Sequence, residues 1–154
     1  MKESEESRNY ASKLLKYRNR SEKEIREKLK QKKFNDTVIA DTIGWLKEKK
    51  YLDDQQFTRE WIESRKRKGY SKKYIHWELK QKGISAETVN LDFDEQEGLL
   101  SDKEVAKKLV EKKIKQYRNL EPTKVKQRIQ NLLLRHGFSW EIIEEVLKKF
   151  DYGD

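Results

Sequence analysis

The sequence of 154 residues contains no cysteine, a single proline and only six glycines. Without cysteine, disulfide scaffolds, thiol nucleophiles and cysteine-ligated zinc or iron-sulfur centres are excluded. The glycines lie far apart, so no glycine-rich loop is present to hold nucleotide phosphates. We therefore expect no cofactor.

Hydrophobic residues are also scarce, at 34% of the chain. No stretch approaches the roughly 20 apolar residues of a membrane span, and residues 1–6 lack the apolar core of a signal peptide. Four Trp, seven Tyr and five Phe at regular spacing nevertheless argue against disorder. We expect a folded cytoplasmic protein that does not enter the membrane.

Charge is what the sequence has in excess. Charged residues make up 42% of the chain, against about 25% in an average globular domain. Lys and Arg number 37 and Asp and Glu 28, which gives a net charge of +9. This balance favours an acidic partner, either nucleic acid or an anionic protein surface.

One unit of the sequence occurs three times, at offsets of 50 and then 54 residues. The matching residues are Ile25, Leu29, Lys33 and Phe34 in the first unit, Ile75, Leu79, Gly83 and Ile84 in the second, and Ile129, Leu133, Gly137 and Phe138 in the third. Within each unit the apolar residues recur at intervals of three, four and seven, which predicts three helices and no strands.

The predicted fold is all-α, with three tandem three-helix repeats at residues 1–52, 53–100 and 101–154. A unit of this size buries too little surface to be stable alone, so we expect the repeats to stack in an elongated curved array. Residues 91–102 contain five acidic residues and no basic ones. We interpret them as an acidic linker and a hinge before the third repeat.

Helix ends are marked by capping residues. Ser21 with Glu24 and Ser101 with Glu104 have the spacing of a capping box, and Ser71 and Ser139 are further candidate caps. The adjacent carboxylates Asp53 and Asp54 precede a helix and are interpreted as caps rather than as a catalytic or metal-binding pair.

Gly69, Gly83 and Gly137 stand where helices should end, in the left-handed conformation that glycine adopts without penalty. Lys33 replaces this glycine in the first repeat. Phe57, Trp61, Ile75 and Leu79 are predicted to support the core of the second repeat. The four tryptophans are expected to serve in core or inter-repeat packing.

Two basic segments are candidate contact surfaces for phosphates or acidic protein. Their residues are Arg65, Lys66, Arg67, Lys68, Lys72 and Lys73 in the second repeat, and Lys108, Lys112 and Lys115 on the first helix of the third. Tyr70 and Tyr74 are placed to stack on a base or on another side chain. A solvated surface that serves only solubility is the alternative for each segment.

Nothing in the sequence indicates an enzyme or a metal site. His76 and His136 have no Asp or Cys at ligand spacing. A free-standing DNA- or RNA-binding protein of helix-turn-helix type is an alternative, with one cluster of base-reading residue types at Gln127, Arg128, Gln130 and Asn131. A pure scaffold with incidental charge is a third possibility.

The second repeat resembles the RecX family of bacterial recombination regulators. The resemblance is carried by Tyr51-Leu52-Asp53-Asp54, Phe57, Trp61, Arg65, Gly69-Tyr70-Ser71, Ile75, Glu78-Leu79 and Lys82-Gly83-Ile84. It continues into the other two repeats. The chain departs from the family pattern at Lys33, around Pro122 and in the acidic linker.

This resemblance implies a non-enzymatic protein that binds the RecA recombinase filament on single-stranded DNA. Such a regulator suppresses the ATP hydrolysis, strand exchange and coprotease activities of RecA, and so modulates DNA repair, recombination and the SOS response. The implied partners are the RecA filament and single-stranded DNA, bound directly or through the filament. We expect the protein itself to be a monomer.

Overall fold

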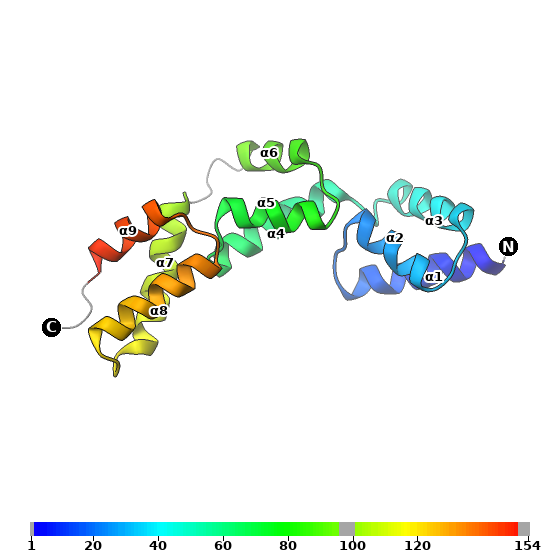
Figure 1. The fold of residues 1–154 in the computed structure, drawn as a ribbon. Helices are drawn as coiled ribbons and strands as arrows, with labels where there is room; N and C mark the ends of the chain where they lie inside the picture. Colours follow the sequence, from blue (N-terminus) through cyan, green and yellow to red (C-terminus); the bar gives the residue numbers. More distant parts are fainter. Residues whose placement is uncertain (1, 96–100, 151–154) are drawn as a thin grey trace. The chain divides into compact units, whose positions relative to one another are not determined.

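The computed structural model describes residues 2–95 and 101–150, and all regular structure in these two ranges is helical (Figure 1). The helices of the described residues are α1 (Lys2–Tyr17), α2 (Glu22–Gln31), α3 (Asp36–Glu48), α4 (Asp54–Lys68), α5 (Lys72–Gln81), α6 (Ala86–Glu95), α7 (Asp102–Ile114), η1 (Lys115–Tyr117), α8 (Pro122–Arg135) and α9 (Trp140–Lys149). The η1 segment is a short 3-10 helix. The prediction of three tandem three-helix repeats is confirmed.

The chain divides into two compact units, each of which contains one complete repeat and part of the second. The amino-terminal unit comprises residues 2–60 and 79–92, and its core is formed by α1, α2 and α3. The carboxy-terminal unit comprises residues 61–78, 93–95 and 101–150, and its core is formed by α7, α8 and α9. The junction between repeats 1 and 2 lies in the first unit and that between repeats 2 and 3 in the second.

Two of the four residues that define the repeat lie inside each middle helix, α2, α5 and α8. Ile and Leu at the two repeat positions have no exposed surface in any of the three copies, namely Ile25, Leu29, Ile75, Leu79, Ile129 and Leu133. Full burial of such a side chain contributes about 1.5–3 kcal/mol. The recurring pair therefore fixes which face of each middle helix packs inward.

The linker predicted at residues 91–102 is partly wrong. Helix α6 extends to Glu95, so residues 91–95 are helical. Asp92 is 1% exposed and lies on the same face of α6 as buried Val89, three residues away. Its carboxylate lies 3.9 Å from the Nε of Arg59. Residues 96–100, the centre of the expected hinge, lie outside the described residues.

The prediction that the tryptophans serve in core or inter-repeat packing is wrong for Trp77 and Trp140. Trp77 and Trp140 are 56% and 53% exposed, whereas Trp45 and Trp61 are half-buried. Trp140 is the first residue of α9 and Trp77 lies on the outer face of α5. Aromatic residue type alone did not show which helix face each ring occupies.

The capping residues explain where the helices begin. Ser21 and Glu24 form the complete capping box at the start of α2. Ser71, Ser101 and Ser139 each accept a hydrogen bond from the backbone N–H three residues later. Each such cap contributes about 1 kcal/mol of helix stability.

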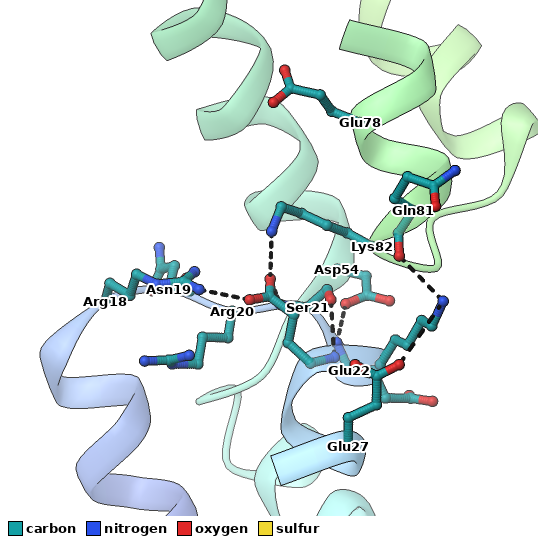
Figure 2. A network of polar contacts seen from close by, with 12 residues as sticks. Arg18, Asn19, Arg20, Ser21, Glu22, Glu27, Asp54, Glu78, Gln81 and Lys82 are labelled. Atoms are coloured by element: carbon teal, nitrogen blue, oxygen red, sulfur yellow. Dashed lines mark hydrogen bonds and ion pairs between the residues drawn. The ribbon is translucent and has the colours of Figure 1, made fainter.

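The adjacent carboxylates of Asp53 and Asp54 cap different helices. Asp53 caps α4, since its Oδ1 accepts hydrogen bonds from the N–H groups of Gln55 and Gln56. Asp54 instead accepts a hydrogen bond of 2.8 Å from the N–H of Glu22, the first residue of α2 (Figure 2). Its carboxylate therefore caps a helix of the preceding repeat.

The same contact occurs at the second junction between repeats. Asp102, the first residue of α7, accepts a hydrogen bond of 2.9 Å from the N–H of Lys72, the first residue of α5. Asp54 and Asp102 thus occupy equivalent positions and each satisfies an otherwise unpaired donor at the start of a middle helix. This repeated carboxylate contact joins each repeat to the next.

The glycines that follow the middle helices of repeats 2 and 3 lie at the same junctions. Gly83 and Gly137 have φ angles of +80° and +86°. A Cβ atom at Gly83 would lie 2.8 Å from the Cβ of Lys23, and one at Gly137 would lie 2.6 Å from the Oγ of Ser71. These positions need glycine for the left-handed backbone and also for close approach to the preceding repeat.

Lys33 shares the left-handed backbone of these two glycines but is exposed. Its φ angle is +66°, so the turn has the same left-handed geometry as the two glycines despite the side chain. Lys33 is exposed, whereas a side chain at Gly83 would meet Lys23. A side chain is sterically allowed here at the cost of backbone strain.

Replacement of Lys33 by glycine is therefore expected to raise the free energy of unfolding. Relief of the left-handed strain contributes about 1 kcal/mol, offset in part by the greater entropy of the unfolded chain. Urea denaturation measures the change. Lys30→Gly, on the exposed side of α2, is the control and should lower stability by about 1 kcal/mol. Equal loss in both variants would contradict the assignment of strain.

Candidate functional site

The carboxy-terminal unit contains an open groove of about 750 Å³ between the end of α4 and one face of α7. We call this the basic groove. It is lined by Glu63, Lys66, Arg67, Lys68, Gly69, Val105, Lys108, Leu109, Lys112, Lys113, Leu132 and His136. Six of these side chains are cationic and one is a carboxylate, so the groove carries a strong positive potential.

The groove exists because α4 ends close to α7. Gly69 follows α4 with a φ angle of +90°, and a Cβ atom there would lie 2.9 Å from a methyl carbon of Leu109. Leu109 is 6% exposed and, with Val105 and Leu132, forms an apolar floor. The close approach at Gly69 places the basic end of α4 beside the basic face of α7.

Two cations of the first basic segment are engaged inside the protein. The Lys66 side chain is 8% exposed, and its Nζ lies 3.2 Å from Oδ1 of Asp102. The Arg65 guanidinium lies 2.7 Å from a carboxylate oxygen of Glu78 and above the rings of Trp61 and Tyr70. Both charges are largely compensated, that of Arg65 within repeat 2 and that of Lys66 across the junction between repeats 2 and 3.

Five cations of the groove remain open to solvent or to a ligand. Arg67, Lys68, Lys108 and Lys112 are exposed and Lys113 is half-buried. None of the five lies within 4.0 Å of a carboxylate among the described residues. The basic groove therefore presents uncompensated charge on both of its walls.

The other predicted contact residues lie outside the groove lining. Lys73 is exposed on α5, and the Lys72 ammonium lies 5.0 Å from the centre of the Phe93 ring. Lys115 lies in η1, because α7 ends at Ile114. Lys113 lines the groove where Lys115 was expected. Its spacing of four residues from Leu109 places both on one helix face and could have identified it from the sequence.

His136 connects the groove to the turn between α4 and α5. Its Nδ1 lies 2.9 Å from the carbonyl oxygen of Gly69, and its own carbonyl accepts a hydrogen bond from the N–H of Ser71. The imidazole stacks on Tyr70 at 4.1 Å between ring centres, and Tyr70 stacks on Tyr74 at 4.7 Å. This arrangement indicates a structural role for the histidine.

Protonation of His136 is expected to destabilise the folded protein. Burial lowers its pKa, the hydrogen bond to Gly69 opposes this, and Arg135, Lys113 and Arg65 add repulsion. The unfolded chain then binds the proton at higher pH than the folded chain. Stability is therefore fully present above about pH 6.5 and is lost as the pH falls below it.

Urea titrations between pH 8 and pH 5 test this expectation. In the His136→Gln variant, stability should depend less on pH over this range. Burial and Lys72 also lower the pKa of His76, so a His76→Gln variant is the matched comparison and the double variant should remove most of the slope. An unchanged slope in the double variant would contradict the assignment.

Other site classes find no support in the part of the chain that the structure describes. Within residues 2–95 and 101–150, no three His, Asp or Glu side chains are grouped closely enough to bind a metal ion. Among the helices of these same residues, none has the length and apolar character needed to cross a membrane.

Three families of helical domain match the chain in the order of the repeats. The first, second and third three-helix domains of RecX match residues 8–46, 53–90 and 101–147. Together these matches cover most of the sequence.

Curated relatives named "Regulatory protein RecX" support the same family. The protein from Mannheimia succiniciproducens is 38% identical over 130 residues, which is 84% of each chain. The protein from Bacillus licheniformis is 35% identical over 144 residues, which is 90% of this chain and 52% of the relative. The chain thus spans about half the length of the Bacillus relatives it matches.

Solved structures show the same fold. A crystal structure of regulatory protein RecX aligns over 96% of this chain and 74% of that chain, with a TM-score of 0.74 and 22% identity. RecX from Lactobacillus salivarius aligns over 96% of each chain with a TM-score of 0.71 and 22% identity. With three domain matches in order and a relative 38% identical over 84% of both chains, this chain belongs to the RecX family of regulatory proteins.

Proposed function

We propose that this chain binds the RecA filament on single-stranded DNA and lowers the ATP hydrolysis, strand exchange and coprotease activities of RecA. It acts by binding, as a cytoplasmic monomer, rather than by catalysis. Its membership of a family of regulatory proteins supports this proposal, as does its net charge of +9.

The observation that best supports this proposal is the basic groove. The basic groove brings together cations from two segments that lie about 40 residues apart, and five of these cations have no carboxylate partner among the described residues. A filament of protein on nucleic acid offers both carboxylates and phosphates to such a surface. Three linked repeats also allow several weak contacts to act together, which raises the effective concentration of each.

The helix-turn-helix alternative receives less support. Gln127, Arg128 and Asn131 are exposed on α8, and Gln130 is half-buried. They lie in the middle of α8 rather than at its start, where base-reading side chains usually stand. Arg128 is also placed over the ring of Tyr117.

ATP hydrolysis by RecA on circular single-stranded DNA tests the proposal. The protein is titrated from well below the RecA concentration up to equimolar, at near-physiological salt of about 0.15 M. We expect half-maximal inhibition at a substoichiometric ratio, because one bound molecule can affect several protomers of a filament.

The salt concentration decides what a negative result means. A basic protein binds DNA non-specifically at low salt, and that binding weakens steeply as salt rises. Unchanged hydrolysis at equimolar protein, with DNA still bound in a parallel filter-binding assay, would refute the regulator and favour the free-standing nucleic-acid-binding protein.

A further inference from the structure

The basic groove differs from a surface that only follows phosphates, because its floor is apolar. Val105, Leu109 and Leu132 line it from α7 and α8. The side chains of Lys108 and Lys112 rise from the same face of α7, four residues apart. Their methylene stems extend the apolar surface, while their ammonium groups stand at the rim.

This combination suits a ligand that carries negative charge and apolar groups in alternation. A ligand with negative charge alone would bind the rim cations, which include Arg67, Lys68 and Lys112. Val105, Leu109 and Leu132 are themselves 2%, 6% and 5% exposed, so the lysine stems supply much of the open apolar surface. This surface gains free energy only from an apolar group that displaces water from it. A peptide with acidic side chains on one edge and aliphatic side chains on the other meets both requirements.

Single-stranded nucleic acid fits the same groove less well. Proteins that bind single strands without sequence preference combine cations with aromatic side chains on which the bases stack. None of the twelve residues that line the groove is Trp, Tyr or Phe. The most exposed tryptophan, Trp77, is not among them.

We infer that the basic groove binds an acidic, aliphatic peptide segment of the protein partner and not the nucleic acid. This inference rests on the proposed function, in which the partner is a protein filament that encloses DNA. The rim cations Arg67, Lys68, Lys108 and Lys112 pair with carboxylates, and the lysine stems over the floor at Leu109 and Leu132 contact the aliphatic side chains. The groove thereby contacts the protein component of the filament.

Fluorescence anisotropy at about 0.15 M salt with three labelled probes tests the inference on the full chain. The first probe is a peptide of about 12 residues, roughly 40 Å when extended, in which Glu alternates with Leu. In the second, Ser replaces every Leu at the same charge. The third is an oligothymidylate of the same number of units. We expect the Glu-Leu peptide to bind at least about tenfold more tightly than the Glu-Ser peptide.

A matched pair of variants locates the binding. Lys108→Gln with Lys112→Gln should weaken the Glu-Leu peptide about tenfold, while Lys13→Gln with Lys16→Gln on the exposed side of α1 should leave its affinity unchanged. Equal affinity for the two peptides would overturn the inference. So would oligothymidylate binding that is tighter than that of the Glu-Leu peptide and depends on Lys108 and Lys112.

The ATPase titration separates this inference from the proposed function. If RecA is inhibited but the Glu-Leu peptide fails to bind, only the assignment of the groove to an acidic peptide falls. If the peptide binds as expected and RecA hydrolysis is unchanged, the assignment of the groove stands and the regulatory function falls.

Discussion

Arg67→Glu, Lys68→Glu and Lys112→Glu together are expected to raise the concentration needed for half-maximal inhibition of RecA by about 100-fold. Each reversal removes an attraction and adds a repulsion of about 1 kcal/mol at an exposed rim position, and about 3 kcal/mol corresponds to roughly 100-fold in affinity. All three side chains are exposed and have no carboxylate within 4.0 Å among the described residues. The fold should therefore tolerate the change.

A variant with the same change in net charge provides the control. Lys13, Lys16 and Lys30 are exposed in the amino-terminal unit, and Lys16 and Lys30 lie in the last turns of their helices, as Arg67 and Lys68 do. Reversal of all three to Glu should weaken inhibition only a few-fold, through the loss of long-range attraction.

The comparison of the two variants in the ATPase titration decides between groove and net charge. Equal losses would show that total charge governs the interaction and that the groove has no special part in it. Thermal denaturation of both variants confirms that each is folded at the assay temperature. Rising salt should reduce the difference between them, because exposed charges are screened.

The sequence was sufficient to predict the fold because the repeat is carried by local and periodic signals. The buried pair Ile25 and Leu29 recurs at fixed offsets, and each middle helix has an apolar stripe with helical spacing. The serines that cap four of the helices accept hydrogen bonds from N–H groups only three residues away. Interactions over such short distances in the chain can be recognised without knowledge of the tertiary structure.

The site was only half predictable, because four adjacent cations look alike in sequence. Successive residues of a helix point about 100° apart, so Arg65 and Lys66 turn towards Glu78 and Asp102 while Arg67 and Lys68 remain exposed. The carboxylate partners lie 13 and 36 residues away. Nothing in the local sequence distinguishes a neutralised cation from an open one.

The groove itself depends on a non-local approach that the sequence did not show. The sequence predicts that Gly69 ends a helix, but its approach to Leu109 joins positions about 40 residues apart. In the sequence, the two basic segments are therefore separate candidate surfaces. Their union on two walls of one groove follows from the packing of the third repeat against the end of α4.

Gly137→Ala is expected to cause the largest loss of stability of any single substitution considered for this chain. The φ angle of +86° costs a side chain about 1 kcal/mol. The added Cβ would lie 2.6 Å from the Oγ of Ser71 and 2.7 Å from the Cβ of Tyr74, and such overpacking costs about 1–3 kcal/mol more. The total is about 3 kcal/mol, a large fraction of the stability of a typical domain.

The position of the clash predicts which contacts are lost. Ser71 caps α5 and its N–H binds the carbonyl of His136, and Tyr74 stacks on Tyr70. A shift of these residues would separate repeats 2 and 3 at their junction. In hydrogen exchange, amides near the start of α5 should therefore lose protection in the variant before those of α1 to α3 do.

Gly44→Ala is the matched control for this experiment. Gly44 lies inside α3, and a Cβ atom there would have no neighbour within 4 Å. Replacement of a glycine by alanine within a helix stabilises it by roughly 0.5–1 kcal/mol, so the same chemical change should have the opposite sign at the two positions. If urea denaturation shows Gly137→Ala to be as stable as the parent chain, the close packing of repeats 2 and 3 at this glycine is wrong.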